Sequence, residues 1–299
     1  MMPLVDLLMP HKSIALIGMS KNAGKTTVLN HLVSGFAACG MRLILTSIGR
    51  DGENTDVVTK TVKPRIFVPA GSIIITAEGL LLLCDVTREI LDVTDFTTPM
   101  GRVVVARALS AGFVQLGGPS ITAQMVELLK KTQIYGADKI IIDGAVSRKS
   151  PAAPDLADAA ILCTGAAISQ NMDEVISKTR HITQMYMLPQ VSPAKNDICL
   201  PGAVTDNKIL SLLSVPDLKS KRIIADDAGK IFISISAYEK FMTRHGSLAV
   251  KKRINLAAVT INPYSPYGIN FNAGEFLKKM RAAIPIPVYN VAEKEGELC

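Results

Sequence analysis

The chain contains 299 residues, of which 48% are hydrophobic, and it carries a formal net charge of +7 at pH 7. This length is sufficient for one large domain or two smaller ones. The five cysteines form no CxxC pair and the four histidines form no metal-binding motif, which excludes a disulfide framework and a zinc site. The basic residues are scattered, without an arginine-rich tract, so nucleic acid is not an expected partner.

No segment of the sequence has the features of a membrane span or a secretion signal. The most apolar stretch, Gly71 to Cys84, is too short to cross a bilayer and contains Glu78. The N-terminus is apolar but lacks the basic start of a signal peptide. We therefore expect a cytoplasmic protein that makes no contact with a membrane.

The first two predicted elements enclose a glycine- and lysine-containing loop. Ser13 to Gly18 is an apolar run of strand length, and Thr26 to Gly40 carries apolar residues at helical spacing. The sequence between and into these elements reads GMSKNAGKTT. Gly24-Lys25-Thr26 is the core of the P-loop pattern, which lies between a strand and a helix in nucleotide-binding proteins.

Each residue type in this loop suits a phosphate group. Free N–H groups at a helix start attract anions, and small residues let phosphate approach the backbone. Lys25 adds a positive charge and Thr26 a hydroxyl that can ligate Mg²⁺. Five residues rather than the common four separate Gly18 from Gly24, so an incidental surface turn is the alternative. The predicted nucleotide-binding residues here are Ser20, Lys21, Asn22, Ala23, Gly24, Lys25, Thr26 and Thr27.

A polar loop follows the next predicted strand, Arg42 to Ile48. It contains Arg50, Asp51 and Glu53, and it lies at the same edge of a parallel sheet as the P-loop. We expect Asp51 or Glu53 to serve the metal or its water shell, with Asp51 the first choice, and Arg50 to touch phosphate or substrate. The alternative is an ordinary solvated loop.

The middle of the chain alternates strand-like and helix-like segments. This alternation predicts an α/β fold with a doubly wound, mostly parallel sheet covered on both faces. Strands are expected at 65–70, 72–77, 101–109, 112–118, 138–144 and 159–166, and helices at 78–91, 120–136 and 171–186.

Asp143 ends the most clearly buried of these strands, Asp138 to Gly144. Open α/β sheets bind ligands at the carboxyl edge of their strands. A P-loop that processes nucleotides needs a carboxylate to hold Mg²⁺, and Asp143 is placed to supply it. A strand-ending aspartate that merely caps a turn is the alternative interpretation.

The chain becomes rich in proline and polar residues around Leu188 to Pro201, where we place a soft boundary. Residues 1–190 are expected to form the nucleotide-binding domain. Residues 191–299 are expected to extend the same sheet and complete the base site. Asn262 follows the apolar strand Ile254 to Asn262, and its amide suits the edge of a purine base; a plain strand-to-loop turn is the alternative.

Three of these motifs resemble the dethiobiotin synthetase and cobyric acid synthase group of P-loop NTPases. GMSKNAGKTT is similar to their P-loop, IIIDGA to their VVEGA motif, and INP to their base-contacting asparagine turn. The resemblance implies their fold and an ATP–Mg²⁺ site. The chain has Asp143 where that group has glutamate, and Val146 and Ser147 replace the glycines that follow, which departs from their carboxylate-activating chemistry.

A resemblance over most of the chain is to the small P-loop subunit of the lysine 5,6-aminomutase reactivase. It is carried by IGMSKNAGKTT, TSIGRDGE, QLGGPSITAQMVELL, ADKIIIDGAVSRKS, DAAILCTGA and INPYSPYG. The resemblance implies an ATP-driven chaperone that exchanges damaged cobalamin in an adenosylcobalamin-dependent aminomutase, together with a larger MutS-like ATPase subunit. Lys25 would hold phosphates, Thr26 and Asp143 would place Mg²⁺, and Asp51 would position water or metal.

Two other classes of function remain open from the sequence. One is an ATP-dependent ligase of the dethiobiotin synthetase type, acting on a small carboxylate. The other is a nucleotide-binding subunit without hydrolysis of its own, which would serve as a scaffold for the larger ATPase.

Overall fold

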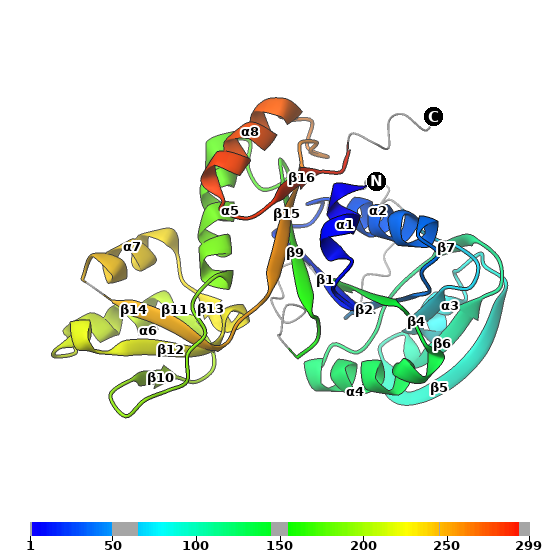
Figure 1. The fold of residues 1–299 in the computed structure, drawn as a ribbon, viewed down its shortest axis with the longest axis horizontal. Helices are drawn as coiled ribbons and strands as arrows, with labels where there is room; N and C mark the ends of the chain where they lie inside the picture. Colours follow the sequence, from blue (N-terminus) through cyan, green and yellow to red (C-terminus); the bar gives the residue numbers. More distant parts are fainter. Residues whose placement is uncertain (1, 50–64, 145–154, 245, 293–299) are drawn as a thin grey trace.

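The computed structural model describes residues 2–49, 65–144, 155–244 and 246–292. It is an α/β structure built on a nine-stranded sheet with the order β16-β15-β9-β1-β8-β2-β4-β6-β5 (Figure 1). The strands from β16 to β4 run parallel, and β6 is antiparallel to both of its neighbours, β4 and β5. Their bounds are β1 Ser13–Gly18, β2 Leu43–Ile48, β4 Ile73–Ala77, β5 Arg88–Thr98, β6 Gly101–Ala108, β8 Lys139–Gly144, β9 Ala159–Gly165, β15 Leu256–Asn262 and β16 Val288–Asn290.

Helices cover both faces of this sheet, as the alternation predicted. Side chains of adjacent strand residues point to opposite faces, so Leu16 joins the core under one set of helices and Ile17 the core under another. The first set is α1 and α2, while α5 and α8 pack on the opposite face beside α4. The helix bounds are α1 Pro3–Leu8, α2 Lys25–Ala38, α3 Glu78–Leu81, α4 Thr122–Thr132, α5 Met172–Tyr186 and α8 Ala273–Ala283.

The predicted helix at 78–91 is wrong beyond its first turn. Only α3 is helical, and the chain then forms β5, which pairs antiparallel with β6 from Arg88 opposite Ala108 onward. The leucine run that suggested a helix leaves Leu82 and Leu83 exposed. The β-branched residues that follow favour a strand once an edge is available to pair with, so tertiary pairing decided this segment.

Between β9 and β15 the chain builds a second, smaller sheet of three parallel strands in the order β10-β12-β14. Residues 256–290 thus add β15 and β16 to the large sheet, while residues 198–252 pair among themselves; a domain division at residue 190 stays a prediction. The remaining elements are β10 Ile198–Leu200, β12 Arg222–Asp227, β14 Ser247–Lys252, α6 Asp206–Ser211, α7 Ile235–Thr243, and the short pairs β11 Val204–Thr205 with β13 Ile231–Phe232 and β3 Ile66–Val68 with β7 Gly112–Val114.

The helix α1 is held against the start of the large sheet by a buried lysine. The Lys139 Nζ donates to the backbone oxygens of Leu8, Met9 and His11 at 3.2, 2.6 and 2.6 Å. The Leu8 and Met9 carbonyls lie at the C-terminus of the helix, where a cation is favourable. Burial lowers the pKa of the Lys139 ammonium. Among the helices of the described ranges, none is both long and apolar enough to cross a bilayer.

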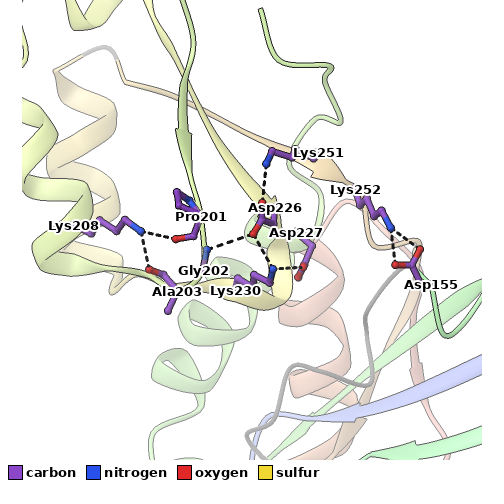
Figure 2. Close-up of polar contacts among 10 residues, drawn as sticks. All are labelled: Asp155, Pro201, Gly202, Ala203, Lys208, Asp226, Asp227, Lys230, Lys251 and Lys252. Carbon is purple, nitrogen blue, oxygen red and sulfur yellow. Dashed lines mark hydrogen bonds and ion pairs between the residues drawn. The ribbon is translucent and has the colours of Figure 1, made fainter. Parts of the chain in front are cut away.

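An ion-pair network closes the carboxyl edge of the small sheet (Figure 2). Asp226 accepts from Lys230 Nζ at 2.8 Å and from Lys251 Nζ at 2.9 Å, and the Gly202 N–H lies 3.4 Å from the same carboxylate. The two ammonium groups hold the pKa of the Asp226 carboxyl well below its usual range. The network therefore joins all three strand ends, because Gly202 follows β10, Asp226 lies in β12 and Lys251 lies in β14.

We expect Asp226→Asn to lower the free energy of unfolding at pH 7 by about 1 kcal/mol, because the network is partly exposed and screened by solvent. A carboxyl whose pKa is depressed by folding stabilises the fold above its unfolded pKa of about 4, and this contribution is lost as pH falls further. The difference between wild type and variant should therefore shrink between pH 5 and pH 2. Urea unfolding at several pH values measures it. Asp217→Asn, at a carboxylate with no ion-pair partner among the described residues, is the control that should show no such trend.

Candidate functional site

The predicted P-loop is a tight turn between β1 and α2. Gly24 is the N-cap of α2 and has φ of +87°, a conformation that favours glycine. Asn22 also has a positive φ, +60°, which asparagine tolerates better than most residues. No side chain caps the start of α2. The first N–H groups of this helix have no intrahelical partner, so the turn presents backbone donors and a helix N-terminus to an anion.

Lys25 is folded back over this turn. Its residue is only 9% exposed although it is the first residue of the helix. A Cβ atom placed on Gly18 would lie 3.0 Å from Lys25 Nζ and 3.1 Å from Lys25 Cδ. A side chain at position 18 would thus push the lysine away, so the glycine is what lets the ammonium lie within the loop.

Asp143 lies at the carboxyl end of the strand beside the P-loop strand. It is opposite Leu16 of β1 on one side and Ser47 of β2 on the other, and it is only 5% exposed. Its Oδ1 accepts from the Gly144 N–H at 2.9 Å. That bond is the turn cap of the alternative interpretation, but it uses a single lone pair of a carboxylate that can accept several hydrogen bonds.

A buried thiol lies on β9, the strand on the other side of β1 from Asp143. Burial raises the pKa of the Cys163 thiol to about 11, and the Lys25 and Asp143 charges act on it in opposite directions. Cys163 is opposite Gly18 in the sheet, and its carbonyl accepts from the Met19 N–H at 3.0 Å. Cys163 is therefore a neutral residue that anchors the first turn of the loop, and a thiolate nucleophile is not expected there.

Asn262 lies against the loop rather than beyond it. Its Nδ2 donates to the Asn22 carbonyl at 3.3 Å, and its Oδ1 accepts from the Tyr264 N–H at 3.1 Å. A Cβ atom on Gly24 would lie 3.1 Å from Asn262 Cβ. The amide that the sequence predicts to contact a purine base holds the backbone of the loop in this structure, and the base contact stays a prediction.

The other predicted site residues have varied positions. Ser20 donates to the Lys21 carbonyl at 3.0 Å; Ala23 is buried, and Thr26 and Thr27 lie partly exposed in the first turn of α2. Arg50, Asp51 and Glu53 lie outside the described residues, so the second metal carboxylate stays a prediction. At the same edge, Gly49 and the Gly118-Pro119 turn exchange backbone hydrogen bonds of 3.3 Å, an approach that the double glycine of QLGGPS signals.

Two residues near the loop were missed from the sequence. The Gly165 Cα faces the backbone carbonyl of Asn262 so closely that a Cβ there would collide with it. The Ala166 N–H donates to that same carbonyl at 2.9 Å. These contacts fix the end of β15 beside β9, and nothing in the local sequence around Gly165 predicts them.

The residues present fit a magnesium nucleotide. A depression of about 180 Å³, part of it open solvent, is lined by Ala23, Gly24, Thr27 and Asn262 among others. It adjoins the loop and encloses no cavity, so a bound nucleotide would lie at an open sheet edge. No group of three or more His, Cys, Asp or Glu side chains that could hold a metal occurs among the described residues, and Mg²⁺ at phosphates needs only one or two carboxylates.

Comparison with protein-family models and with curated proteins finds no match to this chain. The interpretation of the site therefore depends on its motifs and on the geometry described above.

We predict that Asn262→Ala weakens binding of ATP and of inorganic tripolyphosphate alike, by up to about tenfold, the effect of one lost hydrogen bond. Tripolyphosphate carries no base, so a shared loss reports a less ordered P-loop. Calorimetric titration of both ligands, each with Mg²⁺, measures the two affinities. A loss confined to ATP would instead assign Asn262 to the base.

Proposed function

We propose that this chain is a P-loop NTPase of the dethiobiotin synthetase-like fold, acting in the cytoplasm as the ATP-dependent reactivating subunit for an adenosylcobalamin-dependent lysine 5,6-aminomutase. In this proposal it promotes exchange of damaged cobalamin together with a larger MutS-like ATPase subunit. The motif strings that run through most of the chain support the choice of family.

One observation carries the nucleotide part of the proposal. The left-handed turn at Gly24, the ammonium of Lys25 folded over Gly18, and the buried carboxylate of Asp143 lie at the carboxyl ends of adjacent strands. Parallel strands bring these groups to one sheet edge, and this edge is where open α/β sheets hold ligands.

Bound Mg²⁺·ATP would supply a transferable phosphoryl group and the metal charge that stabilises it. The Lys25 ammonium and the N–H groups at the start of α2 would bind the phosphate oxygens. The Thr26 hydroxyl and the Asp143 carboxylate would hold the metal, and Asp51 would orient water or the metal shell. Cys163 is buried and neutral, so it adds no charge to the site.

The work expected of such a site is a change of affinity for a protein. A partner can favour an open, cofactor-releasing state of the aminomutase only by binding that state more tightly than the closed one. Hydrolysis then lowers the affinity of this chain for the open state, so that the aminomutase closes on intact cofactor. Such a switch requires a loop that binds the nucleotide and a carboxylate that holds the metal ion, and the proposal gives the second role to Asp143.

ATP turnover in the presence of different additions tests this function. The proposal predicts slow hydrolysis by the chain alone and faster hydrolysis when the larger subunit and the aminomutase are added. Panels of small mono- and dicarboxylates should leave the rate unchanged. A rate that depends on one small carboxylate and ignores both proteins would contradict the reactivase assignment and favour the ligase.

A further inference from the structure

The amino ends of the strands of the small sheet form one edge, their carboxyl ends form another, and the two differ in electrostatic character. Only three residues, Arg253 to Asn255, connect the end of β14 to β15 of the large sheet. The carboxyl edge of the small sheet therefore lies toward the large sheet, and its amino edge lies at the far end of the molecule (Figure 1). Because β10, β12 and β14 are parallel, the turns that precede all three strands meet at that far edge.

The turns at the amino edge carry cations from three separate segments. Lys195 lies in the turn between Ala194 and Asp197, which is fixed by the Asp197 N–H donating to the Ala194 carbonyl at 3.1 Å. The other cations of this edge are Lys219 and Lys221 directly before β12, and Lys240 and Arg244 at the end of α7 directly before β14.

The turn that holds Lys195 is itself tied to the sheet. Asp197 accepts from Arg222 Nη2 at 2.7 Å and from Arg222 Nε at 3.0 Å. Arg222 is the first residue of β12 and lies opposite Ser247, the first residue of β14. These contacts bring the starts of β10, β12 and β14 together, so the five cations belong to one surface, which we call the basic edge: Lys195, Lys219, Lys221, Lys240 and Arg244.

The cations of the basic edge form no ion pairs in the part of the chain that the structure describes. Within the described ranges none of its five cations forms an ion pair with a carboxylate. Asp197 is already occupied by Arg222, and Asp217 and Glu239 are the carboxylates that remain nearby. Because the whole protein has a net charge of +7, this edge carries a large part of the excess.

At the opposite edge of the small sheet, formed by the carboxyl ends of its strands, the lysines have bonding partners. There Lys230 and Lys251 bind Asp226, Lys252 binds Asp155 at 2.6 Å, and Lys208 binds the Pro201 carbonyl at 2.7 Å (Figure 2). Those side chains join the strand ends and are structural. The basic edge has no comparable internal role, since its side chains point to no described acceptor.

We propose that the basic edge is a docking surface for an acidic face of a partner protein. Complementary charge steers such encounters and fixes their orientation. A nucleic-acid strand would favour aromatic side chains for base stacking, and Phe241, which lies between Lys240 and Arg244 in the sequence, is fully buried. The identity of the partner rests on the proposed function, in which it is the larger ATPase subunit or the aminomutase; the charge of the partner does not.

Charge reversal of the basic edge tests the surface directly. The edge variant is Lys219→Glu with Lys221→Glu and Arg244→Glu, and the matched control is Lys12→Glu with Lys130→Glu and Lys278→Glu, three exposed lysines outside the small sheet. Labelled poly-L-glutamate serves as the acidic polypeptide and polyuridylate of equal charge as the nucleic-acid probe. Fluorescence anisotropy at 50 and 200 mM salt measures binding of both.

We expect the edge variant to lose about tenfold or more in affinity for polyglutamate and most of its salt dependence, while the control changes about twofold or less. Equal losses in both variants, or polyuridylate bound more tightly than polyglutamate through the same residues, would overturn the proposal. Unchanged Mg²⁺·ATP affinity confirms that the edge variant is folded.

The same two variants separate this inference from the proposed function. If the partners stimulate the ATP turnover of the wild type, the edge variant should lose that stimulation and the control should keep it. If the wild type is not stimulated at all, the proposed function fails, whereas the polyglutamate result still decides the basic edge.

Discussion

Replacing Lys25 with alanine is expected to weaken Mg²⁺·ATP binding by about 100-fold or more, the effect of losing charge-assisted hydrogen bonds to two phosphate groups. The absence of a side chain at Gly18 and the left-handed turn at Gly24 leave room for the Lys25 ammonium within the loop. Removing a buried cation also removes its desolvation cost, so the melting temperature should fall little. Calorimetry with Mg²⁺·ATP measures the affinity, and thermal unfolding checks the fold.

Lys12→Ala is the matched control for this change. Lys12 is an exposed lysine that immediately precedes β1, whereas Lys25 lies beyond the carboxyl end of that strand. Its removal should leave nucleotide affinity unchanged. Wild-type affinity in the Lys25→Ala variant would remove the P-loop assignment.

The second large effect is expected from Asp143→Asn. An asparagine keeps an oxygen that can accept from the Gly144 N–H but loses the charge that would hold a metal ion. We expect ATP turnover to fall by about 100-fold or more, nucleotide affinity to change by less than about tenfold, and the Mg²⁺ concentration needed for half-maximal rate to rise. Steady-state rates over a range of Mg²⁺ concentrations measure the turnover and its Mg²⁺ dependence, and calorimetry measures the nucleotide affinity.

Asp158→Asn is the matched control for the carboxylate. The Asp158 carboxylate accepts from the Lys12 and Ser13 N–H groups at 3.0 and 2.9 Å, at the end of β1 remote from the loop. The Asp158→Asn substitution should change the stability of the fold and leave the Mg²⁺ dependence of ATP turnover unchanged. Normal turnover in Asp143→Asn would make Asp143 a turn cap and transfer the metal role to Asp51 or Glu53.

The parts of the site that are local in sequence were predictable. The turn at Gly24-Lys25-Thr26 is predicted by its local sequence, because a glycine directly before a helix and an apolar strand before the turn are short-range signals. Asp143 was found in the same way, since a run of isoleucines ending in aspartate predicts a buried strand and its carboxyl end. Both lie at the carboxyl ends of neighbouring strands, β1 and β8.

The contacts that join distant segments were not predictable. Asn262 bonds to Asn22 across 240 positions of sequence, and no periodicity encodes such a pairing. The leucines before β5 predict a helix, but the pairing of this segment with β6 makes it a strand. The small sheet likewise forms by pairing of three short strands that are separated in the sequence. The β-branched composition of β5 was the available signal.

Recovery of lysine aminomutase turnover after suicide inactivation tests the account most directly. The mixture contains inactivated enzyme, fresh adenosylcobalamin, the larger subunit, ATP and Mg²⁺, with the wild-type chain, its Lys25→Ala variant or no chain. The account predicts recovery only with the wild-type chain and only while ATP is present. Equal recovery with Lys25→Ala, or recovery without the chain, would contradict an ATP-driven switch at this loop.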